Sequence, residues 1–165
     1  MYTISVDHGT NNGIAIFKDT KLISYDNIRL DSVTNLKDAY RIFGEFFGKY
    51  IPNVVVIEKV NIAGSKFGGV NVIKLAQLQA ILILLAQQYN AKVIEVNPMS
   101  VKKFITGNGH AEKEEVAKSV SSVYDIPYKS IIEEIPFKRK IGIQKIEYEK
   151  SDAIANGYFA LSTQL

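Results

Sequence analysis

The chain has 165 residues, of which 47% are hydrophobic and 22% charged, and its formal net charge is +3. This length predicts one domain over residues 1–165, with a core that buries roughly 70% of the surface exposed on unfolding. There is no cysteine, and no apolar stretch reaches the ~20 residues that span a bilayer. These facts exclude disulfides and cysteine nucleophiles, argue against a membrane partner and suit a cytoplasmic protein.

The first third of the chain predicts three antiparallel strands followed by a helix. Residues 2–7 alternate as a strand, Asn12-Gly13 is a turn signal, and residues 14–17 resume the apolar pattern. A third strand is expected at about 22–30. A helix is expected at about 35–50, because its apolar residues recur at helical spacing.

The remainder alternates helices with further strands. Strands are expected at 54–58 and 92–96, and residues 125–148 are irregular apart from a short strand at 141–146. This order predicts a mixed α/β fold with a five-stranded sheet, in which parallel crossovers follow the antiparallel start. The expected helices are about 70–89, a short one that opens at Pro98, 112–124 and 149–161.

Four carboxylates are placed where they can meet. Glu58 ends the β-branched run 54–57, and Asp7 ends the first strand. If these strands are parallel neighbours, both acids emerge at the edge where α/β sheets place their chemistry. Glu149 and Asp152 are three residues apart, so they share one face of the last helix. Their convergence with the strand acids is an inference from topology.

Clustered carboxylates repel one another unless cations neutralise them, and oxygen ligands favour Mg²⁺ or Mn²⁺. Two such ions ~4 Å apart can activate water for an in-line attack on phosphorus. Each acid also has an ordinary structural explanation. Asp7 can form a turn, Glu58 can be a strand-end charge, and an acidic pair is favourable at a helix N-terminus.

Four segments occur in family order over nearly the whole chain and together resemble the RuvC family of Holliday-junction resolvases. They are Ile4–Thr10, Val56–Val60, Val101–Lys113 and Glu149–Ala155. The resemblance implies an RNase H-like fold, a homodimer and Mg²⁺-dependent paired nicking of two opposed strands at a four-way DNA junction during recombination and repair.

The resemblance also assigns roles to residues. Lys102 and Lys113 match basic residues near the DNA backbone and the scissile phosphate, where Lys113 would offset developing negative charge. Without the motif, both would be read as solvated surface lysines. Two Mg²⁺ ions per active site, replaceable by Mn²⁺, are implied. Their ligands and the catalytic acids would be Asp7, Glu58, Glu149 and Asp152.

The chain departs from the bacterial pattern at three places. Glu149 stands where bacterial members usually have Asp, and Asn61 stands where they commonly have an aromatic residue. Lys66 and Phe67, in the glycine-rich segment 63–69, are candidate DNA-binding residues, and Phe67 is either a base-stacking replacement or ordinary core. Segment 125–148 looks longer than in bacterial members. Its basic cluster contacts phosphate or merely caps an exposed hairpin, and it consists of Lys138, Arg139 and Lys140.

Several alternatives stay open. A broader nuclease acting on forks, flaps or RNA would use the same phosphate chemistry, and a junction-binding protein that does not cut is a third class. Residues 7–13 also resemble the first phosphate loop of actin-like ATPases and sugar kinases, but 165 residues are too few for their second lobe. His8 and His110 receive no catalytic role. The apolar face of the 70–89 helix is expected to contribute to the dimer interface, and use of a helicase partner is undecided. Divergence of this kind suits a bacterial or phage-infected host cytoplasm.

Overall fold

The computed structural model describes residues 1–9, 11–30, 35–60, 69–136 and 144–165. Its elements, in chain order, are β1 (Tyr2–Asp7), β2 (Asn11–Lys18), β3 (Lys21–Arg29), α1 (Leu36–Tyr50), β4 (Val54–Glu58), α2 (Gly69–Gln88), β5 (Lys92–Val96), α3 (Pro98–Thr106), α4 (Lys113–Tyr124), the 3₁₀ turn η1 (Tyr128–Ser130), β6 (Glu133–Pro136), β7 (Gln144–Glu147) and α5 (Glu149–Thr163).

The main sheet has five strands in the order β3-β2-β1-β4-β5. Strands β1, β2 and β3 pair antiparallel, whereas β1, β4 and β5 pair parallel. This confirms the predicted mixed sheet with an antiparallel start and parallel crossovers. The parallel pairing of β1 with β4 brings the carboxyl ends of both strands to one edge, and the register sets Val6 beside Ile57.

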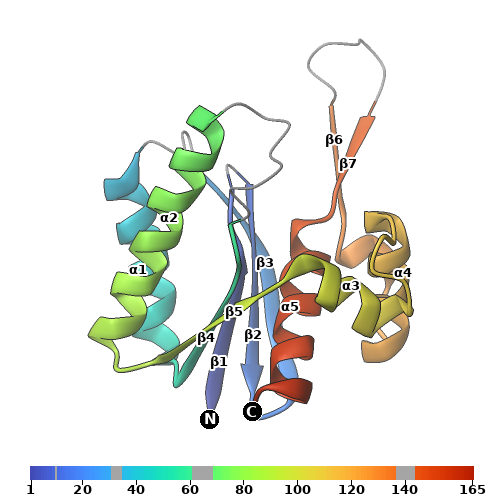
Figure 1. Cartoon of the computed structure of the whole chain (residues 1–165), viewed down its shortest axis with the longest axis horizontal. Helices are drawn as coiled ribbons and strands as arrows, with labels where there is room; N and C mark the ends of the chain where they lie inside the picture. Colours follow the sequence, from blue (N-terminus) through green and yellow to red (C-terminus); the bar gives the residue numbers. More distant parts are fainter. Residues whose placement is uncertain (10, 31–34, 61–68, 137–143) are drawn as a thin grey trace.

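Helices cover both faces of the sheet (Figure 1). Helices α1 and α2 pack on one face, and α3, α4 and α5 pack on the other. Strand β4 is buried on both sides because Val55 and Ile57 face the first layer while Val54 and Val56 face the second. This explains its continuous apolar run. None of the helices in the described ranges is long and apolar enough to cross a bilayer.

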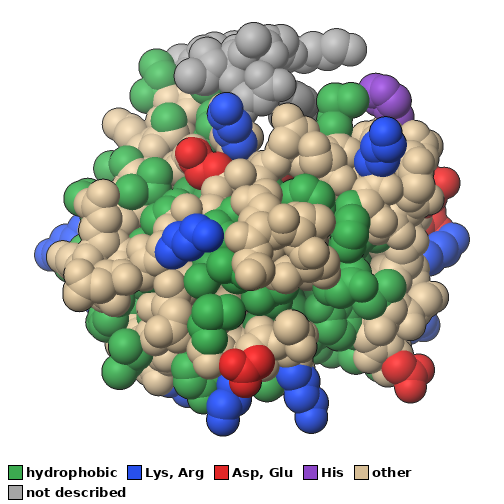
Figure 2. Space-filling model, turned by 60° about the horizontal axis from the view of Figure 1, so that its bottom comes forward, with side chains coloured by type: hydrophobic (Ala, Val, Ile, Leu, Met, Phe, Trp, Pro, Cys, Tyr) green, Lys and Arg blue, Asp and Glu red, His purple; other side chains and the backbone are tan. Residues whose placement is uncertain are grey.

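Both termini lie at the end of the sheet opposite the carboxyl ends of β1 and β4 (Figure 1). Figure 2 turns this end forward, and hydrophobic side chains occupy the middle of the visible face. Lys and Arg side chains appear there singly or in pairs, mostly toward the rim. The visible face therefore carries no broad basic tract formed by described residues.

The turn predicted at Asn12-Gly13 is wrong, because both residues lie inside β2. The Asn12 side chain is buried and helps to close the preceding connection. Its Oδ1 accepts a hydrogen bond from the Gly9 N–H at 2.9 Å, and its Nδ2 donates to the Ile28 carbonyl oxygen at 3.0 Å. Asn12 and Gly13 therefore have structural roles inside the strand. Asn12 supplies buried hydrogen bonds, and Gly13 lets the backbone of Glu149 come close.

The second difference lies in segment 125–148, which forms η1 and a two-stranded hairpin of β6 and β7. The predicted strand at 141–146 overlaps β7, although residues 141–143 lie outside the described part. Strand β6 was not predicted. Both strands are four residues long and rich in charged side chains, so they carry no apolar alternation that would reveal them.

Candidate active site

A cavity of about 210 Å³ lies at the carboxyl ends of β1 and β4. The last residue of each strand supplies an acid to its lining, and α5 supplies a third. Basic residues from α3 and α4 complete the polar lining. Its residues are Asp7, Glu58, Pro98, Val101, Lys102, Lys113, Val116, Asp152, Ala155 and Asn156. Sequence reasoning identified the three acids and two lysines but missed Asn156, whose apolar surroundings on α5 give no signal.

Two glycines let α5 lie close against the sheet and bring Asp152 to this cavity. A Cβ on Gly13 would lie 1.8 Å from the carbonyl oxygen of Glu149, and a Cβ on Gly157 would lie 2.3 Å from the ring of Phe17. Neither distance is sterically possible. Since Gly13 pairs with Asp7 in the β1–β2 register, the first turn of α5 is set directly beside the strand end that carries Asp7.

The pKa values of the three cavity acids are raised, chiefly by burial. Burial raises the pKa of Asp7 well above its ordinary value, and repulsion from Asp152 and Glu58 adds to this effect. Burial and Asp152 likewise raise the pKa of Glu58. Burial raises the pKa of Asp152 although Lys113 opposes the shift. The ionised forms of these carboxylates are therefore less favourable at the site than in water.

Lys113 supplies part of the missing positive charge. Its Nζ donates to Asp152 Oδ2 at 2.6 Å. Burial lowers the pKa of Lys113, but attraction to Asp152 and Asp7 outweighs burial and raises it above the ordinary lysine value. Lys102, at the same cavity, donates from Nζ to the Ala111 carbonyl oxygen at 2.7 Å. Both lysines thus belong to the site as well as to a helix surface.

Glu149 lies one helical turn before Asp152, but it is not part of the cavity lining. Burial raises its pKa, and its Oε2 is buried without a hydrogen-bond partner among the described residues. The structure thus brings three of the four predicted acids together and leaves the fourth next to them. Within the described ranges, no three His, Asp or Glu side chains lie close enough together to ligate one ion.

The residues present fit a hard divalent cation. All the acidic groups are carboxylates, which are the ligands that Mg²⁺ and Mn²⁺ prefer. Their raised pKa values express a deficit of positive charge that a cation would relieve. An ion shared by three of them would require other side-chain rotamers.

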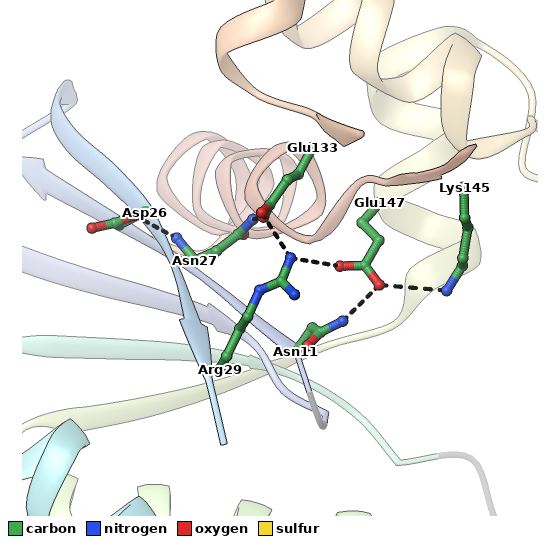
Figure 3. A network of polar contacts seen from close by, with 7 residues as sticks. All are labelled: Asn11, Asp26, Asn27, Arg29, Glu133, Lys145 and Glu147. Carbon is green, nitrogen blue, oxygen red and sulfur yellow. Dashed lines mark hydrogen bonds and ion pairs between the residues drawn. The ribbon is translucent and has the colours of Figure 1, made fainter. Parts of the chain in front are cut away.

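A polar network beside the site was not predicted (Figure 3). It joins the β6–β7 hairpin to the ends of β2 and β3, and its central group is the buried carboxylate of Glu147. Its contacts between the β2–β3 strands and the hairpin join residues more than 100 positions apart in sequence, so no local pattern reveals them. The members of the network are Asn11, Asp26, Asn27, Arg29, Glu133, Lys145 and Glu147.

The predicted DNA-binding residues Lys66, Phe67, Lys138, Arg139 and Lys140 lie outside the described residues, as does Asn61. Burial lowers the pKa of His8 to about 4, and His8 is not part of the cavity lining. His110 lies in the turn before α4, where its backbone N–H donates to Asn108 Oδ1.

A mixed sheet in this strand order, with acids at the carboxyl ends of two adjacent parallel strands and on a helix packed across them, defines an RNase H-like nuclease. A family model described as crossover junction endodeoxyribonuclease RuvC matches residues 5–135. The chain belongs to this family, which confirms the resemblance found in the sequence.

Named relatives and solved structures agree with this assignment. Crossover junction endodeoxyribonuclease RuvC of Chloroherpeton thalassium is 30% identical over 138 residues, which cover 76% of this chain and 71% of the relative. The Ehrlichia canis protein of the same name is 30% identical over 138 residues, covering 78% of this chain and 86% of the relative. A Thermus thermophilus RuvC structure in complex with Holliday junction substrate superimposes with a TM-score of 0.72 at 17% identity, covering 99% of this chain and 96% of that one. A Fowlpox virus resolvase bound to Holliday junction DNA gives a TM-score of 0.59 at 18% identity, covering 98% and 99%.

Proposed function

We propose that this chain is a structure-selective endonuclease that resolves four-way DNA junctions by paired, symmetric nicks. The observation that carries the proposal is the meeting of Asp7, Glu58 and Asp152 at one cavity in a member of this family. These acids come from two strands and a helix, so the fold itself assembles them. The solved relatives with Holliday junctions bound support the choice of substrate.

Asp7, Glu58 and Asp152 would hold divalent cations, and Glu149 would join them from the first turn of α5. Mg²⁺ is the expected ion, with two ions in each site and Mn²⁺ as a substitute. When bound, such ions would activate the attacking water and neutralise charge on the phosphate and leaving oxygen.

The protein's own groups prepare the site for a phosphodiester. The cavity is lined both by the acids Asp7, Glu58 and Asp152 and by the two lysines Lys102 and Lys113. Lys113 already lies within hydrogen-bonding distance of an acid, so it can exchange that partner for a phosphate oxygen. It would thereby offset negative charge that develops during the reaction.

Symmetric nicking requires two active sites, and we expect them in a homodimer. Helix α2 exposes Ile73 and Leu84, with 60% and 52% of their surface accessible. These residues are eleven positions apart, which is close to three helical turns, so they lie on one side of α2. Tyr40 of the neighbouring helix α1 is also exposed. This apolar surface is the proposed contact between two copies.

The decisive experiment compares labelled four-way junctions, forks, flaps and linear duplex, each with Mg²⁺, Mn²⁺ or EDTA. Wild type should nick junctions symmetrically with Mg²⁺, leaving 5′-phosphate and 3′-hydroxyl ends, and Asp152→Asn should bind junctions without cutting. Equal cutting of every branched substrate would replace the proposal with a general branched-DNA nuclease. Tight junction binding without any cutting would indicate a structural junction-binding protein.

A further inference from the structure

The carboxylate of Glu147 is held at the corner of the main sheet, two residues before Glu149. Only 4% of the Glu147 surface is exposed. Asn11 Nδ2 donates to Glu147 Oε1 at 2.6 Å, and Arg29 Nη2 lies 3.7 Å from Glu147 Oε2. Asn11 and Arg29 are register partners in the β2–β3 pair, so neighbouring positions of the sheet contact one carboxylate.

Arg29 also resolves a charge conflict inside the hairpin. Glu133 and Glu147 are directly opposite each other in the β6–β7 register, where two like charges destabilise a strand pair. Arg29 Nη2 contacts both, at 2.7 Å from Glu133 Oε1 and 3.7 Å from Glu147 Oε2 (Figure 3). One guanidinium therefore lies between the two acids, offsets part of their repulsion and joins both hairpin strands to β3, and Lys145 Nζ adds a second positive charge 3.5 Å from Glu147 Oε1.

The contacts of Asn11 and Arg29 with Glu147 are connected to the active site through β2. Asn11 and Gly13 are two positions apart, so they lie on the same face of the strand. Asn11 contacts the side chain at position 147, and Gly13 accommodates the backbone at position 149. Gly13 also pairs with Asp7. A single strand thus sets where the chain enters α5 relative to the first site acid.

We propose that Asn11, Arg29 and Glu147 are positioning residues that fix the start of α5, so that Glu149 and Asp152 face Asp7 and Glu58. This rests on the proposed metal-dependent nuclease function. Without these three residues, β7 would lose its contacts with β2 and β3 immediately before Glu149 and Asp152. The position of these two acids would then depend on the packing of α5 alone. Groups that orient ligands from outside commonly change metal affinity by 10–100-fold.

The test uses Arg29→Met, which keeps the length of the side chain but removes its charge and its fork of donors. The matched control is Arg41→Met, which breaks the exposed ion pair between Arg41 and Glu45 on α1, away from the site. Mn²⁺ affinity is measured by calorimetry without DNA. Amide hydrogen exchange is measured without metal at Asp152, whose N–H donates to the Tyr148 carbonyl oxygen in the first turn of α5. Far-UV circular dichroism selects a temperature at which every variant is folded.

Arg29→Met should weaken Mn²⁺ binding about tenfold or more and speed amide exchange at Asp152, whereas Arg41→Met should change neither. Unchanged Mn²⁺ affinity in a folded Arg29→Met protein would overturn the positioning role, even if its melting temperature falls. If Arg29→Met does not fold, Glu147→Gln serves instead, since its amide oxygen can still accept from Asn11. Failure of wild type to bind Mn²⁺ would overturn the proposed function itself, and the positioning role with it.

Discussion

The backbone of Glu149 occupies the space that a side chain at Gly13 would require. A Cβ built on Gly13 would lie 1.8 Å from the Glu149 carbonyl oxygen and 2.2 Å from its carbonyl carbon. Backbone atoms cannot move aside as the end of a flexible side chain can. The position of Glu149 and Asp152 on α5 therefore depends on the absence of a side chain at Gly13 in β2.

Gly13→Ala should destabilise the protein by about 1–3 kcal/mol and greatly reduce junction cleavage, because α5 must move away from β2. Urea unfolding and a cleavage assay measure the two effects. Gly44→Ala is the matched control. A Cβ on Gly44 would meet only Leu85 Cδ2 at 3.8 Å, and the position is inside α1, so stability should rise by about 0.5–1 kcal/mol. A Gly13→Ala protein with wild-type stability would show that α5 is not in contact there.

Asp7→Asn should abolish cleavage yet stabilise the metal-free protein. Burial and the nearby Asp152 and Glu58 raise the pKa of Asp7, which means that its ionised form is unfavourable in the folded state. Replacing the charge with a neutral amide should add on the order of 1 kcal/mol to the free energy of unfolding near pH 7. Urea unfolding in EDTA measures this gain. A loss of stability in EDTA would contradict the repulsion inferred between the acids.

Lys113→Met should lower metal-free stability and increase the stabilisation that Mg²⁺ provides. The ammonium of Lys113 neutralises Asp152, and without it a cation has less competition for the carboxylate. Because the Lys113 side chain is 53% exposed, the loss in EDTA should be modest, about 1 kcal/mol. Melting curves with and without Mg²⁺ compare the two proteins. Cleavage should nevertheless fall at least tenfold, since the variant cannot offset charge on the phosphate.

Leu84→Lys should convert the expected homodimer to a monomer at micromolar concentration, because it places a charge in the proposed apolar contact on α2. Val123→Lys is the control, since Val123 is similarly exposed at 48% but lies on α4, on the other face of the sheet. Sedimentation velocity distinguishes the outcomes. A wild-type protein that sediments as a monomer would refute the dimer directly.

The sequence predicted the elements whose side chains follow a strong local pattern. The run ending at Glu58 indicated a doubly covered strand, and the i, i+3 spacing of Glu149 and Asp152 indicated one helix face. Both depend on neighbours along the chain. The sequence did not show that Asp152 lines the cavity while Glu149 lies beside it. This difference depends on how α5 is rotated against β1 and β2.

Local signals failed where distant residues determine the structure. Asn12-Gly13 has the composition of a hairpin turn, yet Asn12 bonds to β3 and Gly13 meets α5. Strand β6 has no apolar pattern in its sequence. Its charged residue Glu133 is held by Asn27 and Arg29, which lie more than 100 residues earlier in the chain. Contacts of this kind become visible only after the chain has folded.

The hairpin is attached to the protein at its base, through Glu133 and Glu147, and its other end begins at the register pair Pro136 and Gln144. An insertion or deletion between Pro136 and Gln144 is separated from Glu149 by the whole of β7. It is also separated from Glu149 by the ion pairs of Arg29 with Glu133 and Glu147 at the base of the hairpin. A foreign peptide such as an epitope, inserted between Pro136 and Gln144, should therefore leave the acids of the active site in their positions.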